Sequence, residues 1–87
     1  MVKQFVRVKN PTGLHLRPAG LLCREALRYQ SSIRFLFGDS VVNAKSVLSV
    51  LGACIKSGDE IELVCDGADE DEAMRGVVAL IESGLGE

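Results

Sequence analysis

The sequence has no apolar stretch long enough to cross a bilayer, and its first residues lack the apolar run and small-residue cleavage pattern of a signal peptide. It also lacks close cysteine pairs: Cys23, Cys54 and Cys65 are odd in number and far apart, unlike a zinc site or a disulfide framework. We therefore expect a cytoplasmic protein with no membrane insertion. Its cysteines are predicted to be reduced and buried, as small hydrophobic residues.

Histidine is nearly absent as well, since His15 is the only one in the chain. With no second histidine and no acid cluster near it, the sequence predicts neither a bound metal ion nor another cofactor. An enzyme with its own small-molecule pocket would also need an acid–base partner close to His15, and none is present. The 87 residues contain no repeats or linkers, so we expect a single domain over residues 1–87 with one site.

Charge is distributed unevenly along the chain. Residues 1–56 carry nine Lys and Arg against two acids, a net charge of +7, and residues 57–87 carry one against ten, a net charge of −9. The basic part contains His15 and favours an anionic ligand or an acidic protein partner, unless folding interleaves the two parts. A nucleic-acid-binding module is the less favoured alternative at a pI near 5.4. It would need exposed aromatic residues, for which Phe5 is one candidate, and the acidic residues 60–66 oppose it.

Four segments alternate between apolar and polar residues as strands do: residues 2–9, 32–37, 41–42 and 60–66. The second and third are separated by Gly38-Asp39, which predicts a hairpin. In the last segment, Ile61, Leu63 and Cys65 are expected to face inward, and Val64 to lie on the outer side with the acidic residues.

Helical spacing follows in three places. Residues 16–29 place one stripe toward the core: Pro18, Ala19, Leu22, Cys23, Ala26 and Tyr29. Ser46 is expected to cap a short helix that stops near Gly52, and Asp69 with Glu72 forms a predicted capping box for a helix that ends at Gly84. The order β-α-β-β-α-β-α predicts an α+β fold, an open-faced two-layer β-sandwich. Its four-stranded, mainly antiparallel sheet would be covered on one face by three helices.

The segment around the histidine combines features of an anion site. His15 lies where the first strand and turn give way to a helix, so it occupies or adjoins the N-cap, and the backbone N–H groups of Leu16 and Arg17 have no helical acceptor. Pro18 loses no hydrogen bond in this first turn. The helix dipole and the Arg17 guanidinium both favour a phosphate group. The pattern predicts a nucleophilic imidazole beside a phosphate site, although the spacing also fits a plain cap or surface histidine.

A docking surface is predicted from the helical wheel. Arg17, Arg24 and Arg28 fall on one side of the first helix, opposite the core stripe, with Leu21 beside them. The short second helix cannot bury all of its apolar residues, which are Val47, Leu48, Val50 and Leu51. An exposed apolar patch flanked by cations fits a transient acidic protein partner, although such a row of cations is also typical of a solvated face.

Two segments resemble one protein family. Residues 13–19, Gly-Leu-His-Leu-Arg-Pro-Ala, resemble the active-site signature of HPr, the histidine-containing phosphocarrier of the phosphoenolpyruvate-dependent sugar phosphotransferase system. Residues 43–51 are similar to the regulatory serine region of HPr from Gram-positive bacteria, and residues 67–70 and 84–87 match that branch too. Two positions depart from the family pattern: Leu16 and Gly20 stand where small, and small or hydroxylated, residues are usual.

The resemblance implies a carrier rather than an enzyme. His15 would take a phosphoryl group on Nδ1 from enzyme I and pass it to sugar-specific acceptor proteins, and Arg17 would steady the phosphate. Ser46 would be phosphorylated by an ATP-dependent Ser kinase/phosphorylase and read by a catabolite-control regulator. The alternative is a regulatory paralogue that acts mainly through phosphorylated Ser46. Partner proteins are expected to dock on Leu16, Gly20, Leu21, Arg24, Val47, Leu48 and Leu51.

Overall fold

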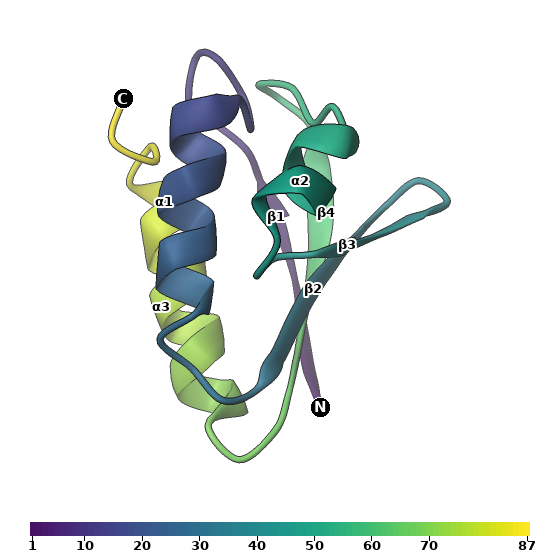
Figure 1. Ribbon diagram of the computed structural model, residues 1–87, viewed down its shortest axis with the longest axis vertical. Helices are drawn as coiled ribbons and strands as arrows, with labels where there is room; N and C mark the ends of the chain where they lie inside the picture. Colours follow the sequence, from purple (N-terminus) through teal and green to yellow (C-terminus); the bar gives the residue numbers. More distant parts are fainter.

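The computed structural model describes residues 1–87 and has the predicted order of elements (Figure 1). The strands are β1 (Val2–Arg7), β2 (Ser32–Phe37), β3 (Ser40–Asn43) and β4 (Glu60–Asp66). The helices are α1 (Leu16–Ala26), α2 (Val47–Gly52) and α3 (Glu70–Glu82). The predicted α+β open-faced sandwich is confirmed. None of the helices has the length and hydropathy needed to span a membrane.

The sheet does not follow the order of the sequence. Its strand order is β1-β4-β2-β3, and every neighbouring pair is antiparallel. The acidic β4 therefore lies between β1 and β2, which come from the basic part of the chain. The cations of β1 and β2 thus flank the acids of β4, while Arg17 and Arg24 of α1 remain exposed on the helix that starts at His15.

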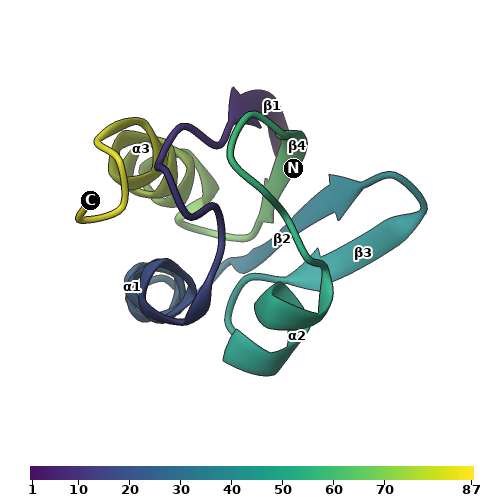
Figure 2. The same cartoon turned by 90° about the horizontal axis from the view of Figure 1, so that it is seen from above.

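The helices lie on one face of the sheet. In Figures 1 and 2, α1 and α3 run side by side, and α2 lies next to α1 near β3. The α1 stripe is buried as predicted from Pro18 to Ala26, and Tyr29 is half-buried. The inward side of β4 is likewise buried at Ile61, Leu63 and Cys65.

Val64 faces away from the helices, as predicted, and is nevertheless buried. β4 is an inner strand, and Val64 is paired with Lys3 on one side and Arg34 on the other. Long cationic side chains can cover an apolar neighbour with their aliphatic stems while their charged ends stay in water. Periodicity within one strand does not show which neighbours flank it.

Two elements are shorter than expected. β1 ends at Arg7, although Val8 and Asn10 remain buried beyond it. α1 ends at Ala26 because its last turn tightens: the N–H groups of Arg28 and Tyr29 donate to carbonyl oxygens three residues back. The helical spacing that includes Tyr29 therefore continues in a turn and not in the helix.

The predicted capping box at the start of α3 is wrong. Asp69 is the N-cap residue but makes no side-chain cap bond. Its carboxylate instead accepts hydrogen bonds from the Ser31 hydroxyl and from the N–H groups of Gln30 and Ser31, the latter two at 2.9 Å. These bonds, the Ser31 hydroxyl first, hold the pKa of Asp69 below its ordinary value. Asp69 thus ties the start of α3 to the segment that joins α1 to β2, a contact that no local pattern indicates.

Candidate functional site

His15 is the N-cap residue of α1, as the sequence predicted. Its backbone is extended, its carbonyl oxygen accepts the first helical bond from Ala19 at 2.8 Å, and its exposed side chain makes no cap bond. The imidazole is therefore not engaged in holding the helix. The N–H groups of Leu16 and Arg17 have no acceptor in the chain, and Pro18 has no N–H. These two donors and the positive end of the helix dipole lie next to the imidazole ring, which makes no hydrogen bond to the helix.

The loop before His15 is held against the segment that follows α2. Gly13 has a φ of +68°, in the left-handed region. A Cβ on Gly13 would lie 2.6 Å from the carbonyl oxygen of Ile55 and 2.7 Å from the Cα of Lys56. The next residue, Leu14, donates its N–H to the same Ile55 oxygen at 2.9 Å and is buried. Only glycine at position 13 allows this close approach, which fixes the backbone two residues before the imidazole.

We expect Gly13→Ala to lower the free energy of unfolding by about 2 kcal/mol or more, because it combines left-handed strain with a backbone clash. Gly20→Ala is the matched control. Gly20 lies inside α1, and a Cβ there would meet nothing within 4 Å. Alanine should therefore raise the free energy of unfolding by about 1 kcal/mol, the usual helix preference. Urea denaturation measures both changes, and equal effects of the two substitutions would contradict the tight packing at Gly13.

A hollow of about 430 Å³ opens beside His15. Leu51 of α2 lines it, so α2 and the start of α1 share this part of the surface. Cys54 lines it as well and corrects the expectation that all cysteines are buried: Cys23 and Cys65 are buried, and Cys54 is exposed with a φ of +54°. The complete lining is Thr12, Leu14, His15, Leu51, Cys54, Ile55 and Lys56.

Sequence reasoning missed most of this lining. The residues before position 15 and those at 54–56 are separated by the first helix, the β2–β3 hairpin and the second helix. Their meeting depends on the hydrogen bond between Leu14 and Ile55, which no periodicity indicates. Gly13 is the one local signal in the sequence, since a glycine just before a helix marks a turn, and its φ is indeed positive.

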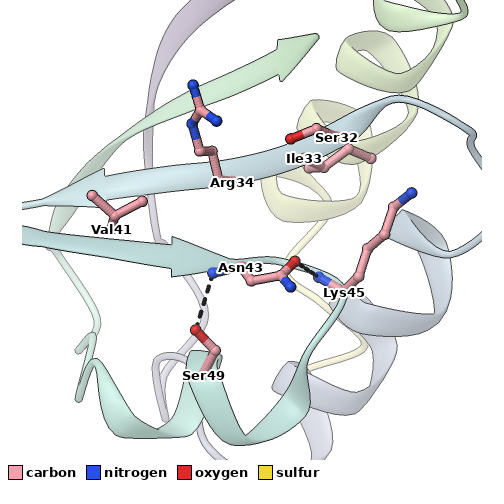
Figure 3. Close-up of a pocket in the computed structure, with 7 residues that line it drawn as sticks. All are labelled: Ser32, Ile33, Arg34, Val41, Asn43, Lys45 and Ser49. Atoms are coloured by element: carbon pink, nitrogen blue, oxygen red, sulfur yellow. Dashed lines mark hydrogen bonds between the residues drawn. The ribbon is translucent and has the colours of Figure 1, made fainter. Parts of the chain in front are cut away.

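Ser46 is the N-cap residue of α2 as predicted, with its hydroxyl oxygen accepting from the Ser49 N–H at 3.2 Å. Figure 3 shows the scaffold beside it. The Asn43 side-chain oxygen accepts from the Lys45 N–H, the Ser49 hydroxyl accepts from the Asn43 N–H, both at 3.0 Å, and Lys45 Nζ donates to Tyr29. These bonds fix the turn that presents Ser46 at a partly exposed position.

A second hollow of about 360 Å³ opens at this scaffold. Arg34 and Lys45 bring two cations to its lining, and no carboxylate contributes to it. The complete lining is Ser32, Ile33, Arg34, Val41, Asn43, Lys45 and Ser49. This hollow is polar and cation-bearing, adjoins the turn that holds Ser46, and is distinct from the hollow beside His15.

The predicted docking residues divide by exposure. Leu16 and Leu48 are strongly exposed, with 63% and 82% of their surface accessible, and Arg24 is exposed too. The remaining four are partly buried: Gly20, Leu21, Val47 and Leu51. α1 and α2 pack together, so these residues come from two neighbouring helices.

Arg17 and Arg24 of α1, and Arg28 in the turn after it, are also exposed, as the helical wheel predicted. Arg28 is paired with Glu25 at 3.2 Å, whereas Arg17 and Arg24 form no ion pair within 4 Å. The free cations of the row are therefore those closest to His15. No group of three His, Cys, Asp or Glu side chains is arranged to hold a metal ion.

Comparison with known proteins gives a consistent result. A family model described as "PTS HPr component phosphorylation site" matches residues 2–83. The HPr-like protein Crh of Halalkalibacterium halodurans is 44% identical over 82 residues, which cover 94% of this chain and 98% of that protein. The phosphocarrier protein HPr of Neisseria meningitidis serogroup B is 38% identical over 87 residues, covering 100% and 98%. The solved structure of HPr from Thermoanaerobacter tengcongensis superposes with a TM-score of 0.96 at 38% identity, again covering 100% and 98%.

Proposed function

Since this chain belongs to the HPr family of the phosphotransferase system, we propose that it accepts a phosphoryl group from enzyme I on His15 and passes it to sugar-specific acceptor proteins. The observation that carries this proposal is the placement of its only histidine. The imidazole is exposed at the N-cap of α1, makes no cap bond, and lies beside two N–H groups without acceptors. In this role the protein is a carrier, and its partners supply the catalysis.

The proposed transfer is a displacement at phosphorus. A ring nitrogen, Nδ1 by family resemblance, forms a bond to phosphorus while the bond from phosphorus to the donor breaks. The phosphoryl oxygens then lie at the start of α1, where the N–H groups of Leu16 and Arg17 and the helix dipole favour negative charge. The Arg17 guanidinium, which has no acidic partner, stabilises the same charge.

The experiment that tests this function is incubation with phosphoenolpyruvate and enzyme I, followed by mass spectrometry of the intact protein. A carrier gains one phosphoryl group that is lost in acid, as expected of a phosphohistidine. Omission of enzyme I should abolish the gain, because the proposal assigns the catalysis to the partner. A protein that remains unmodified with active enzyme I would contradict the carrier function.

A second function is favoured by one observation, the 44% identity to a protein named Crh. In this alternative the chain is a regulatory paralogue, and Ser46, phosphorylated by a Ser kinase/phosphorylase, recruits a catabolite-control regulator. The N-cap position of Ser46, at the positive end of the α2 dipole, supports a phosphate there. The two functions separate in one comparison: a regulator would be modified by the kinase with ATP and not by enzyme I with phosphoenolpyruvate.

Leu48→Asp should weaken transfer both from enzyme I and to acceptor proteins, by about tenfold in kcat/KM, because it puts a charge in the apolar part of the proposed docking surface. Its effect on the free energy of unfolding should stay within about 0.5 kcal/mol, since the side chain is 82% exposed. Steady-state kinetics with varied partner concentration measures the first effect, and urea denaturation the second.

Leu27→Asp is the control for that substitution. Leu27 is also an exposed leucine, at 62%, but it caps the C-terminal end of α1, the end opposite His15. The control should transfer like wild type. Equal losses in both variants would show that added negative charge, and not the position of Leu48, weakens transfer.

A further inference from the structure

The end of the chain is folded back onto the molecule by the way α3 stops. After Ser83, the Gly84 N–H donates to Ile81 at 3.2 Å and the Leu85 N–H donates to Leu80 at 3.3 Å. Gly84 has a φ of +95°. This pair of bonds with a left-handed glycine is the Schellman arrangement, which commonly brings an apolar residue back onto the helix. Here that residue is Leu85, which is fully buried in the core.

The buried Leu85 places Glu87 over the loop that precedes His15. One oxygen of the Glu87 side chain accepts from the Thr12 N–H at 3.2 Å and from Asn10 Nδ2 at 2.9 Å. The Thr12 hydroxyl is 2.8 Å from both carboxylate oxygens. A single carboxylate thus joins the end of the chain to two residues of the loop.

Asn10 connects Glu87 to the backbone that leads to His15. It is 1% exposed, and its Nδ2 donates both to Glu87 and, at 2.7 Å, to the carbonyl oxygen of Gly13. Its Oδ1 is buried without a hydrogen-bond partner. Turning the amide over would bring Oδ1 against the Gly13 oxygen and the Glu87 carboxylate, so the observed orientation is the one these two acceptors require. The Gly13 backbone is therefore held from the Glu87 side by Asn10 and from the other side by the segment at Ile55.

We infer that Glu87 is a positioning residue for phosphoryl transfer at His15, acting through Asn10 and Thr12 on the backbone that leads to the imidazole. This inference rests on the proposed carrier function. Glu87 itself makes no contact with the ring. Its role is to reduce the freedom of residues 10–13, so that His15 starts α1 in one geometry, and small displacements of a reacting group reduce rates strongly.

The charge of the carboxylate matters for these contacts. Hydrogen bonds from Asn10 and then from Thr12 hold the pKa of Glu87 below its ordinary value, and the charge of Arg17 adds a smaller effect in the same direction. Because the folded pKa is lowered, the stabilisation is present above the pKa of the unfolded chain, about 4.3. It is lost as the pH falls through the lower folded value. The contact is therefore complete at neutral pH.

The test compares Glu87→Gln with Glu82→Gln in the enzyme I transfer assay. Both substitutions remove one negative charge near the end of the chain, but Glu82 is exposed and makes no hydrogen bond with its side chain. An amide at position 87 has one acceptor oxygen and cannot accept all the bonds that the two carboxylate oxygens accept. We expect Glu87→Gln to lower kcat by about tenfold with KM for enzyme I unchanged. Glu82→Gln should match wild type.

The amide proton of Thr12 gives a second readout, which reports the Glu87 contact itself, whereas the change in kcat at unchanged KM separates a positioning role from a purely structural one. In wild-type protein its NMR shift should titrate in acid, with a midpoint below the ordinary pKa of a glutamate, and this titration should be absent in Glu87→Gln. An unchanged kcat, a rise in KM alone, or an equal loss in Glu82→Gln would each overturn the positioning role while leaving the carrier function standing. A wild-type protein that accepts no phosphoryl group would overturn the carrier function, and the positioning role with it.

Discussion

Replacing His15 with alanine should abolish phosphoryl acceptance from phosphoenolpyruvate and enzyme I, because the chain has no second imidazole. The fold should persist. The His15 side chain is exposed and makes no cap bond, and its carbonyl oxygen, which starts the helix, is retained by alanine. The expected change in the free energy of unfolding is within about 0.5 kcal/mol, as for surface substitutions generally. Intact-protein mass spectrometry measures the first result, and urea denaturation the second.

The two measurements together distinguish loss of the phosphoryl acceptor from loss of the fold. A variant that folds like wild type and remains unlabelled assigns the modification to this residue. Undiminished, acid-labile labelling of His15→Ala would contradict the role of the imidazole. Labelling that survives acid would instead indicate a hydroxyl acceptor, such as the N-cap serine of α2.

Phosphorylation of Ser46 should lower transfer from enzyme I by at least about tenfold through KM, corresponding to about 1.4 kcal/mol of lost association. Ser46 starts α2 and Leu51, near its end, lines the hollow beside His15. At 1.5 Å per residue these positions are about 7.5 Å apart along the helix axis. A phosphate of about −1.5 to −2 charge therefore lies at the N-terminal end of α2, the end away from the imidazole. There it repels an acidic partner.

The fold should tolerate this phosphate. The Ser46 oxygen already accepts from the Ser49 N–H, and negative charge at a helix N-cap agrees with the dipole. Ser46→Asp should reproduce the direction of the effect with a smaller size, since it adds a single charge. Ser40→Asp, at an exposed serine in the β2–β3 hairpin, is the control and should leave KM unchanged. Full transfer rates in the phosphorylated protein, or loss of its fold, would contradict a switch that works by repulsion at the docking surface.

The features that the sequence predicted correctly depend on interactions over a few residues. His15 and Ser46 are N-caps because turn residues and helical spacing meet at those points, and the inward faces of β4 and α1 follow from period alone. The errors share a different cause. Asp69 bonds to the segment between α1 and β2, the unforeseen burial of Val64 depends on the two strands that flank it, and Cys54 is exposed beside a loop forty residues away in the chain. Each depends on contacts that form only when distant segments meet, as does the contact between Glu87 and Thr12.

The position of β4 between β1 and β2 has a consequence for how the chain folds as it is synthesised. Only the β2–β3 hairpin joins strands that are neighbours in sequence. β1 pairs with β4 alone, Val2 opposite Cys65 and Arg7 opposite Glu60, so it has no partner while the first 59 residues emerge from the ribosome. Contacts this distant in sequence are typical of slower folding. The nascent segment also carries the excess of positive charge in residues 1–56. The arrival of β4 completes the sheet and brings in the first of the compensating acids, and the remaining acids follow with α3. Native topology and the loss of the positive excess therefore both belong to the late part of synthesis.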